Sequence, residues 1–406
     1  MGKLVFACKA THVPSLYLSE LPGKHHGCRQ AAIDGLHEIA HRMMDRGVDT
    51  VVIFDTHWLV NSAYHINCGS HFKGTYTSNE LPHFIHDMPF EHTGNPVLGQ
   101  LIAEEARKLG VRAMGHEIDS LELEYATLVP MRYMGQVEGC NFKVVSIAAF
   151  LTSHLHSDSR KMGEALLTAI ERYDGNVGVI ASGSLSHYFI PDHRAEEGLN
   201  AFTNEFNRQV DEHVMKLWTE GRFEEFCKML PEYAVACQGE GAMHDTVMLL
   251  GLLGWDQYKE KVDVICPLFP SSGTGQVIWE SPIPESIKQE AKLDELFAKV
   301  NDCLASTGVF PLGGIRSRAI FLDTYRMADG AHDYAFVHMT LKIGSGRDLE
   351  TRKAAGEKLF AVITDHFAQL QSKRLLALSF EMQELDPVLN FKKNNVHAFL
   401  KTQQPS

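Results

Sequence analysis

Two histidines stand where apolar strands are expected to end. The segment LVFACKAT leads into His12, and the segment TVVIFDT leads into His57. Ligands of open α/β sheets bind outside the carboxyl ends of the strands, so we expect these two imidazoles at one sheet edge. Two imidazoles and one carboxylate form the ligand set that holds non-haem Fe(II) on one face and leaves the opposite face open for substrate and O2. The pattern therefore predicts a metalloenzyme that uses oxygen.

The third ligand has two candidates in the downstream segment GEGAMHDTVMLLGLLGW. Glu240 and His244 are four residues apart and would share one face of a helix, so spacing leaves both open. His187, in SGSLSH, resembles His12 and His57 in its place at the end of a predicted strand, and glycine and serines there let the backbone approach a ligand. The chain has 22 histidines, so their presence alone is uninformative. The alternative for His12, His57 and His187 is that they only cap strands with hydrogen bonds.

The elements that must position these residues alternate between strand and helix. Apolar runs predict strands at 4–11, 49–58, 141–150 and 176–187, and helical periodicity predicts helices at 28–47, 95–110 and 159–175. This alternation is typical of an α/β fold with a mostly parallel central sheet covered by helices. His12, His57 and His187 all fall at the carboxyl edge of that sheet.

The second half of the chain contains a further unit after a linker. Residues 195–255 are expected to be helical, and strands are expected at 262–270 and 276–280. The run SPIPES, with Pro282 and Pro284, is typical of a linker because two close prolines suit neither a helix nor a central strand. Beyond it, the pattern predicts helices at 292–308 and 349–370 and strands at 317–327, 333–343 and 375–385. We therefore expect two domains, 1–283 and 284–406.

Composition excludes several classes of function. The net charge of −13 argues against nucleic-acid or anionic-membrane partners, which favour a basic face. No run approaches the roughly 18 apolar residues of a membrane span, and the N-terminus lacks the features of a signal peptide. The eight cysteines form no C-x-x-C pair, which indicates a reduced, cytoplasmic protein.

Longer motifs resemble a known family over roughly residues 1–283. THVPSLYLSELPGKHHGCRQ, FDTHWLVNSAYHINC, SGSLSHYF, GEGAMHDTVMLLG and LFPSSGTGQ are similar to the class III extradiol ring-cleaving dioxygenases. The resemblance implies that His12, His57 and Glu240 bind Fe(II) and that His187 is an acid/base. It also implies that the substrates are O2 and a catechol, 3,4-dihydroxyphenylacetate. The same ligands would also accept Mn(II) or zinc, so a zinc hydrolase is one alternative. The other is a non-catalytic binding module, because proteins that resemble this fold also serve as binding or signalling modules.

One position departs from the family pattern. Many members carry a second catalytic histidine where LEYATLVP places Tyr125. Tyrosine can donate a hydrogen bond, but its unperturbed pKa near ~10 makes it a poor base at neutral pH. Tyr125 is therefore a catalytic candidate, and nearby His116 is a weaker one.

The tail resembles a second family over roughly residues 291–401. LFAKVN, GVFPLGGIRSRA, MADGAHDYAFVHMTLKIGSGR and LALSFEMQEL are similar to 5-carboxymethyl-2-hydroxymuconate Δ-isomerases of the tautomerase superfamily. The resemblance implies a βαβ trimer with an N-terminal proline as base, and Arg316 and Arg318 match its arginine-bearing loop for a dicarboxylate. Pro282 and Pro284 are internal, and an acylated proline nitrogen is not basic. We therefore expect a tail that aids homo-oligomer assembly without isomerase activity, the alternative being a bifunctional enzyme.

Overall fold

The computed structural model describes residues 2–194, 198–284, 291–320, 322, 325–330 and 334–402. It divides the chain into two compact units, Met1–Pro284 and Glu285–Ser406, and each unit is described by itself. The larger unit contains the three predicted metal ligands, so its sheet is described first.

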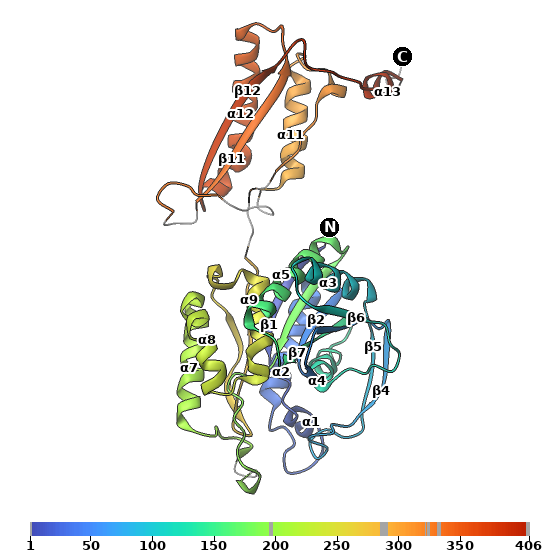
Figure 1. Cartoon of the computed structure of the whole chain (residues 1–406), viewed down its shortest axis with the longest axis vertical. Helices are drawn as coiled ribbons and strands as arrows, with labels where there is room; N and C mark the ends of the chain where they lie inside the picture. The colour runs from blue at the N-terminus through green and yellow to red at the C-terminus, as the bar shows by residue number, and fades with distance from the viewer. Residues whose placement is uncertain are drawn as a thin grey trace. The chain divides into compact units, whose positions relative to one another are not determined.

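The N-terminal unit is built on an eight-stranded sheet (Figure 1). In sheet order the strands are β6 (Ala113–His116), β3 (Tyr64–Asn67), β7 (Lys143–Leu151), β2 (Thr50–Val60), β8 (Asn176–Ser182), β1 (Lys3–Ala10), β10 (Thr274–Glu280) and β9 (Asp263–Ser271). The central strands β7, β2, β8 and β1 are all parallel to their neighbours within this group. The strand β10 pairs antiparallel with β1 and with β9. This confirms the predicted mostly parallel sheet.

Helices cover both faces of the sheet, and each face has its own apolar core. One core contains α3 (Pro96–Lys108), α5 (His156–Arg172), α7 (Glu205–Glu220), α8 (Phe223–Ala236) and α9 (His244–Leu253). The other contains α1 (Ser15–Glu20), α2 (Gln30–Asp45) and α4 (Tyr125–Met134). Successive strand residues alternate between them: Val52 and Phe54 enter the first core, and Val51 and Ile53 the second. Both faces of β2 are therefore buried, which explains its continuous apolar run.

Sequence patterns predicted the long central elements better than the short ones. The helices α2, α3 and α5 confirm three predictions, and the predicted helical stretch 195–255 contains α7, α8 and α9 among its described residues. The expected strand 176–187 was too long, because β8 ends at Ser182 and the residues that follow form a loop. The strands β3 and β6 and the antiparallel pair β4 (His71–Tyr76) and β5 (Met88–Thr93) were not predicted. These strands are short and several residues in them are polar.

The C-terminal unit has its own small core. It contains α11 (Leu293–Ser306), β11 (Tyr334–Gly344), α12 (Leu349–Gln371), β12 (Leu375–Leu385) and α13 (Val396–Thr402). The two strands pair in parallel from Tyr334↔Leu375 to Gly344↔Leu385, and α12 supplies Leu359, Ile363 and Phe367 to the core. The strand predicted at 317–327 is wrong for its described residues, which pair with no neighbouring strand; 321, 323 and 324 lie outside the described residues.

No helix in the described part of the chain is long and apolar enough to cross a membrane.

Candidate metal centre

The carboxyl ends of β1 and β2 deliver the two predicted histidine ligands. His12 lies two residues past the end of β1. His57 lies where the regular pairing of β2 with β7 is interrupted after Asp55. The Asp55 carboxylate accepts hydrogen bonds from the backbone N–H groups of His57 (2.9 Å) and Trp58 (3.0 Å). This buried carboxylate holds the strand irregularity that turns the His57 side chain into the site.

Glu240 begins a short turn with unusual backbone geometry. Gly241, Ala242 and Met243 have φ values of 54°, 54° and 65°, so three successive residues are left-handed. Two of them carry a Cβ, and this conformation costs roughly 1–2 kcal/mol for each such residue. Strained backbone of this kind clusters at functional sites, where the surrounding structure holds it in place. The turn is held by a hydrogen bond from the Glu240 N–H to the Leu185 carbonyl (3.2 Å).

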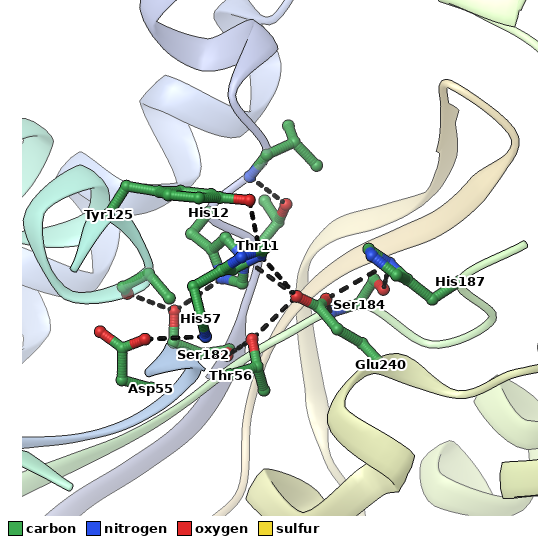
Figure 2. A network of polar contacts seen from close by, with 12 residues as sticks. Thr11, His12, Asp55, Thr56, His57, Tyr125, Ser182, Ser184, His187 and Glu240 are labelled. Atoms are coloured by element: carbon green, nitrogen blue, oxygen red, sulfur yellow. Dashed lines mark hydrogen bonds and ion pairs between the residues drawn. The ribbon is translucent and has the colours of Figure 1, made fainter. Parts of the chain in front are cut away.

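His12, His57 and Glu240, which we name the ligand cluster, converge on one point (Figure 2). The Glu240 Oε1 lies 3.0 Å from His12 Nε2 and 3.2 Å from His57 Nε2. One possible ligand atom from each residue lies within 4.8 Å of the other two. All three side chains are largely shielded from solvent, so the set could replace part of the hydration shell of a cation.

The charge state of the ligand cluster suits a cation. Burial opposes ionisation of Glu240, but His12 and His187 and the hydrogen bonds from the two ligand imidazoles outweigh it and hold the pKa of Glu240 well below its usual range. Burial likewise opposes protonation of His57, yet the hydrogen bond and charge of Glu240 raise the pKa of His57. A buried carboxylate that attracts positive charge from two imidazoles will also attract a metal ion.

Hydroxyl and amide groups orient the ligands, and sequence reasoning missed them. Ser182 Oγ lies 2.9 Å from His12 Nδ1 and donates to the Ala126 carbonyl (2.6 Å). Thr56 Oγ1 donates to Glu240 Oε1 (2.8 Å), and the Ser184 N–H donates to Glu240 Oε2. Such partners fix the rotamers of metal ligands. In the sequence, only the position of Thr56, Ser182 and Ser184 near the ends of the predicted strands that became β2 and β8 could have identified these residues.

His187 and Tyr125 lie at the edge of the ligand cluster (Figure 2). His187 Nδ1 lies 2.9 Å from Ser184 Oγ and 3.7 Å from Glu240 Oε2. Burial, together with the neighbouring imidazoles, lowers the pKa of His187. Tyr125 Oη lies 2.6 Å from His57 Nε2. Burial and the charge of Glu240 raise the pKa of Tyr125 well above its usual value, so this phenol is a donor and not a base.

A cavity of about 270 Å³ opens onto this centre. Its lining includes Thr56, His57, Phe150, His187, Gln238 and Glu240. A larger cavity of about 410 Å³, between β5 and α4, contains none of the ligand cluster. The smaller cavity is therefore the one that matters for chemistry at the centre.

The other sequence candidates lie elsewhere. His244 Nδ1 contacts Ser159 Oγ (2.6 Å) on α5, so His244 does not join the ligand cluster. His116 Nε2 contacts His65 Nδ1 (2.8 Å), and the two rings stack. Arg316 and Arg318 are exposed in the C-terminal unit and belong to a different compact unit.

Comparison with known families matches both units. Residues 6–280 match the family described as the catalytic LigB subunit of aromatic ring-opening dioxygenase. Residues 283–400 match 5-carboxymethyl-2-hydroxymuconate isomerase. The chain belongs to the LigB dioxygenase family and carries, in addition, a domain of the isomerase family. Both resemblances seen in the sequence are confirmed, and the chain is an enzyme of the aromatic ring-opening dioxygenase class.

Individual relatives make the similarity more specific. The chain is 67% identical over 269 residues to the Escherichia coli 3,4-dihydroxyphenylacetate 2,3-dioxygenase, covering 66% of this chain and 97% of that protein. It is 65% identical over 117 residues to the E. coli 5-carboxymethyl-2-hydroxymuconate Delta-isomerase, covering 29% of this chain and 93% of that protein. A solved isomerase from Deinococcus radiodurans R1 is 44% identical, with a TM-score of 0.27, and the match covers 27% of this chain and 84% of that one.

Proposed function

We propose that the N-terminal unit opens the ring of 3,4-dihydroxyphenylacetate with O2, forming 5-carboxymethyl-2-hydroxymuconate semialdehyde, with Fe(II) held by the ligand cluster. The convergence of two imidazole nitrogens and one buried carboxylate oxygen is the observation that carries this proposal. The substrate comes from the 67% identical dioxygenase, whose name specifies it. A ligand set that leaves one face of the metal open suits a reaction in which two small molecules must meet.

The residues of the centre fit a divalent metal. The contact between Ser182 Oγ and His12 Nδ1 leaves His12 Nε2 directed at Glu240, as a metal ligand requires. When bound, Fe(II) would supply open coordination positions for both reactants and the capacity for electron transfer, which zinc lacks. The nitrogen His57 Nε2 now faces the Tyr125 hydroxyl, so Tyr125 must change partner when that nitrogen binds a metal. The Tyr125 hydroxyl would then be available to donate to a ligand beside the metal.

His187 is the residue that we assign to proton transfer. A lowered pKa keeps its imidazole neutral at neutral pH, so it can accept a proton from a catechol hydroxyl. Its Nδ1 faces Ser184 Oγ, and this contact holds the ring beside the cavity. The same imidazole, once protonated, can return the proton as the ring opens. General acid/base groups of this kind contribute about 10²–10⁴-fold to the rate.

For the C-terminal unit we propose a role in assembly of a homo-oligomer, without isomerase activity. Its boundary is proposed at 283/284. The segment where the first strand of an isomerase is expected, next to Pro282 and Pro284, includes β10, which pairs with β1 and β9 of the dioxygenase sheet. Tyr258 Oη donates to the Pro282 carbonyl (2.7 Å), which also ties this proline to the N-terminal unit. An internal proline has an amide nitrogen, which cannot act as a base.

The test is anaerobic reconstitution with Fe(II), followed by O2 uptake with a panel of catechols. We expect stoichiometric O2 uptake with 3,4-dihydroxyphenylacetate and formation of a ring-opened product. Zinc-loaded protein is the control and should take up no O2. Hydrolysis by the zinc form would instead favour the hydrolase, and tight catechol binding without O2 uptake by the iron form would favour the binding module.

We also propose a cytoplasmic location. The absence of disulfides among the eight cysteines suits it.

A further inference from the structure

Two cationic side chains are buried in the described part of the chain, and only one has a counter-ion there. Lys9 is fully buried, and its Nζ lies 2.7 Å from Asp245 Oδ2. Arg29 is 6% exposed, yet no described carboxylate lies within ion-pair distance of it. Burying a charge is costly unless an opposite charge compensates it. The Arg29 Cζ lies 5.4 Å from the centroid of the Phe269 ring, but no described residue supplies an opposite charge to this buried guanidinium.

All hydrogen-bond acceptors around Arg29 are neutral. Its Nε donates to Ser15 Oγ (2.8 Å), and its Nη2 donates to the Leu199 carbonyl and to Ser271 Oγ (3.1 Å). Its Nη1 donates once, to Asn200 Oδ1 (3.0 Å). The guanidinium has five N–H groups, so one on Nη1 has no partner among the described residues. The Asn200 side chain is exposed, which makes the Nη1 edge the side that a ligand can reach.

The position of Arg29 relates it to the metal centre. Ser15, which accepts the Nε–H, follows His12 by three residues and opens α1. Ser271 ends β9, beside the first residue of β10, and β10 pairs with β1, the strand that ends two residues before His12. The guanidinium thus lies against the segment that follows His12 and against the end of β9. The described residues that line the cavity beside Glu240 include no lysine or arginine.

We propose that Arg29 binds the carboxylate of the catechol side chain and so makes the centre selective for acidic catechols. This inference rests on the proposed ring-cleavage function. A carboxylate would use the Nη1 donor that has no described partner and would replace Asn200 Oδ1, supplying a negative charge that none of the described residues provides there. Arginine suits this task because its planar fork matches a carboxylate with two parallel hydrogen bonds. Burial also lowers the pKa of Arg29, which an anionic ligand would reverse.

The experiment compares 3,4-dihydroxyphenylacetate with 4-methylcatechol, which lacks the carboxylate. For the iron-loaded full chain, we expect the ratio of kcat/KM for the acid to kcat/KM for the neutral catechol to fall about 10- to 100-fold in Arg29→Gln. Arg29→Lys, which keeps the charge but loses the fork, should be intermediate. Arg42→Gln is the matched control: it removes one positive charge from α2, but Arg42 pairs with Asp263 and Glu280. Its ratio should equal that of the wild type.

Binding to the metal-free chain provides a second readout, independent of turnover. Calorimetry should show that the wild type binds 4-hydroxyphenylacetate more tightly than 4-methylphenol, and that Arg29→Gln loses this difference. If Arg29→Gln lowers kcat/KM equally for the acidic and the neutral catechol, and lowers affinity equally for the acidic and the neutral phenol, Arg29 is a structural residue and the proposal is overturned. If the wild type cleaves no catechol, the proposed ring-cleavage function is wrong. The calorimetric comparison still shows whether Arg29 binds a carboxylate.

Discussion

His244 should make the N-terminal unit lose stability as the pH falls below neutrality. Burial, and then the charges of His156 and His154, lower the pKa of this imidazole to about 3. In the unfolded chain the pKa returns to about 6.5. The folded state therefore binds fewer protons than the unfolded state between these two values. Stability from neutral His244 is fully present above pH 6.5 and is lost as the pH decreases through this window.

The size of the effect follows from the two pKa values. Over the whole window the difference is about 5 kcal/mol, at about 1.4 kcal/mol for each pKa unit. Between pH 7.5 and pH 5 it amounts to about 2 kcal/mol, a large part of the stability of an ordinary domain. His244 is 2% exposed, so solvent screening does not reduce this figure substantially.

Tryptophan fluorescence in urea can measure this effect in the N-terminal unit alone, because all four tryptophans (58, 218, 255 and 279) lie there. The free energy of unfolding should fall between pH 7.5 and pH 5 by about 2 kcal/mol more in the wild type than in His244→Asn, whose amide can still contact Ser159. A chelator in all samples prevents metal binding from adding its own pH dependence. Equal pH dependence in the two proteins would refute the assignment of a buried, neutral His244.

The other predictions concern the centre and the tail. Alanine at any member of the ligand cluster should abolish metal binding and turnover together, while His244→Asn keeps its metal; metal analysis showing the reverse would refute the cluster. His187→Ala should retain iron and catechol binding but lose about 10²–10⁴-fold in kcat, and unchanged kcat would leave His187 a structural residue. Tyr125→Phe should lose less, as measured in the same assay. The intact chain should not isomerise 5-carboxymethyl-2-hydroxymuconate, and an enzymatic rate would contradict this; activity only after cleavage before Pro282 or Pro284 would indicate a latent enzyme.

The sequence predicted the central sheet because its strongest patterns coincide with its most buried elements. Long apolar strands such as β2 and amphipathic helices such as α2 carry enough residues for the pattern to exceed chance. The strands β3 and β6 have four residues each, too few for two-residue alternation to be distinctive. The stretch 317–327 shows the opposite error: its apolar residues suggested a strand, but Ile320 and Leu322 are exposed and the described residues have no strand partner.

Sequence patterns could not decide whether Glu240 or His244 is the third metal ligand. Placing both residues on one helical face assumed a continuous helix from Glu240 onward. The structure interrupts that helix with left-handed residues from Gly241 to Met243, and α9 begins only at His244. Glu240 consequently faces His12 and His57, while His244 faces Ser159 on α5. Left-handed alanine and methionine have no sequence signal, since neither residue favours that conformation, so only family resemblance could select Glu240 before the backbone was known.

The same strain connects the fold to the chemistry of the centre. The three left-handed residues let the Glu240 carboxylate approach the ends of β1 and β2 while α9 remains packed against α5. The two helices are in close contact at Gly163 and Gly251, where a Cβ would lie 2.1 and 2.2 Å from backbone atoms of the other helix. His156 Nε2 lies 2.8 Å from the Ala242 carbonyl within the turn, so α5 contacts both the helix and the strained segment. A regular helix through residues 241–243 would relieve the backbone strain, but it would move the Glu240 carboxylate away from His12 and His57. The turn therefore persists because close helix packing on one side and the two imidazoles on the other both require it.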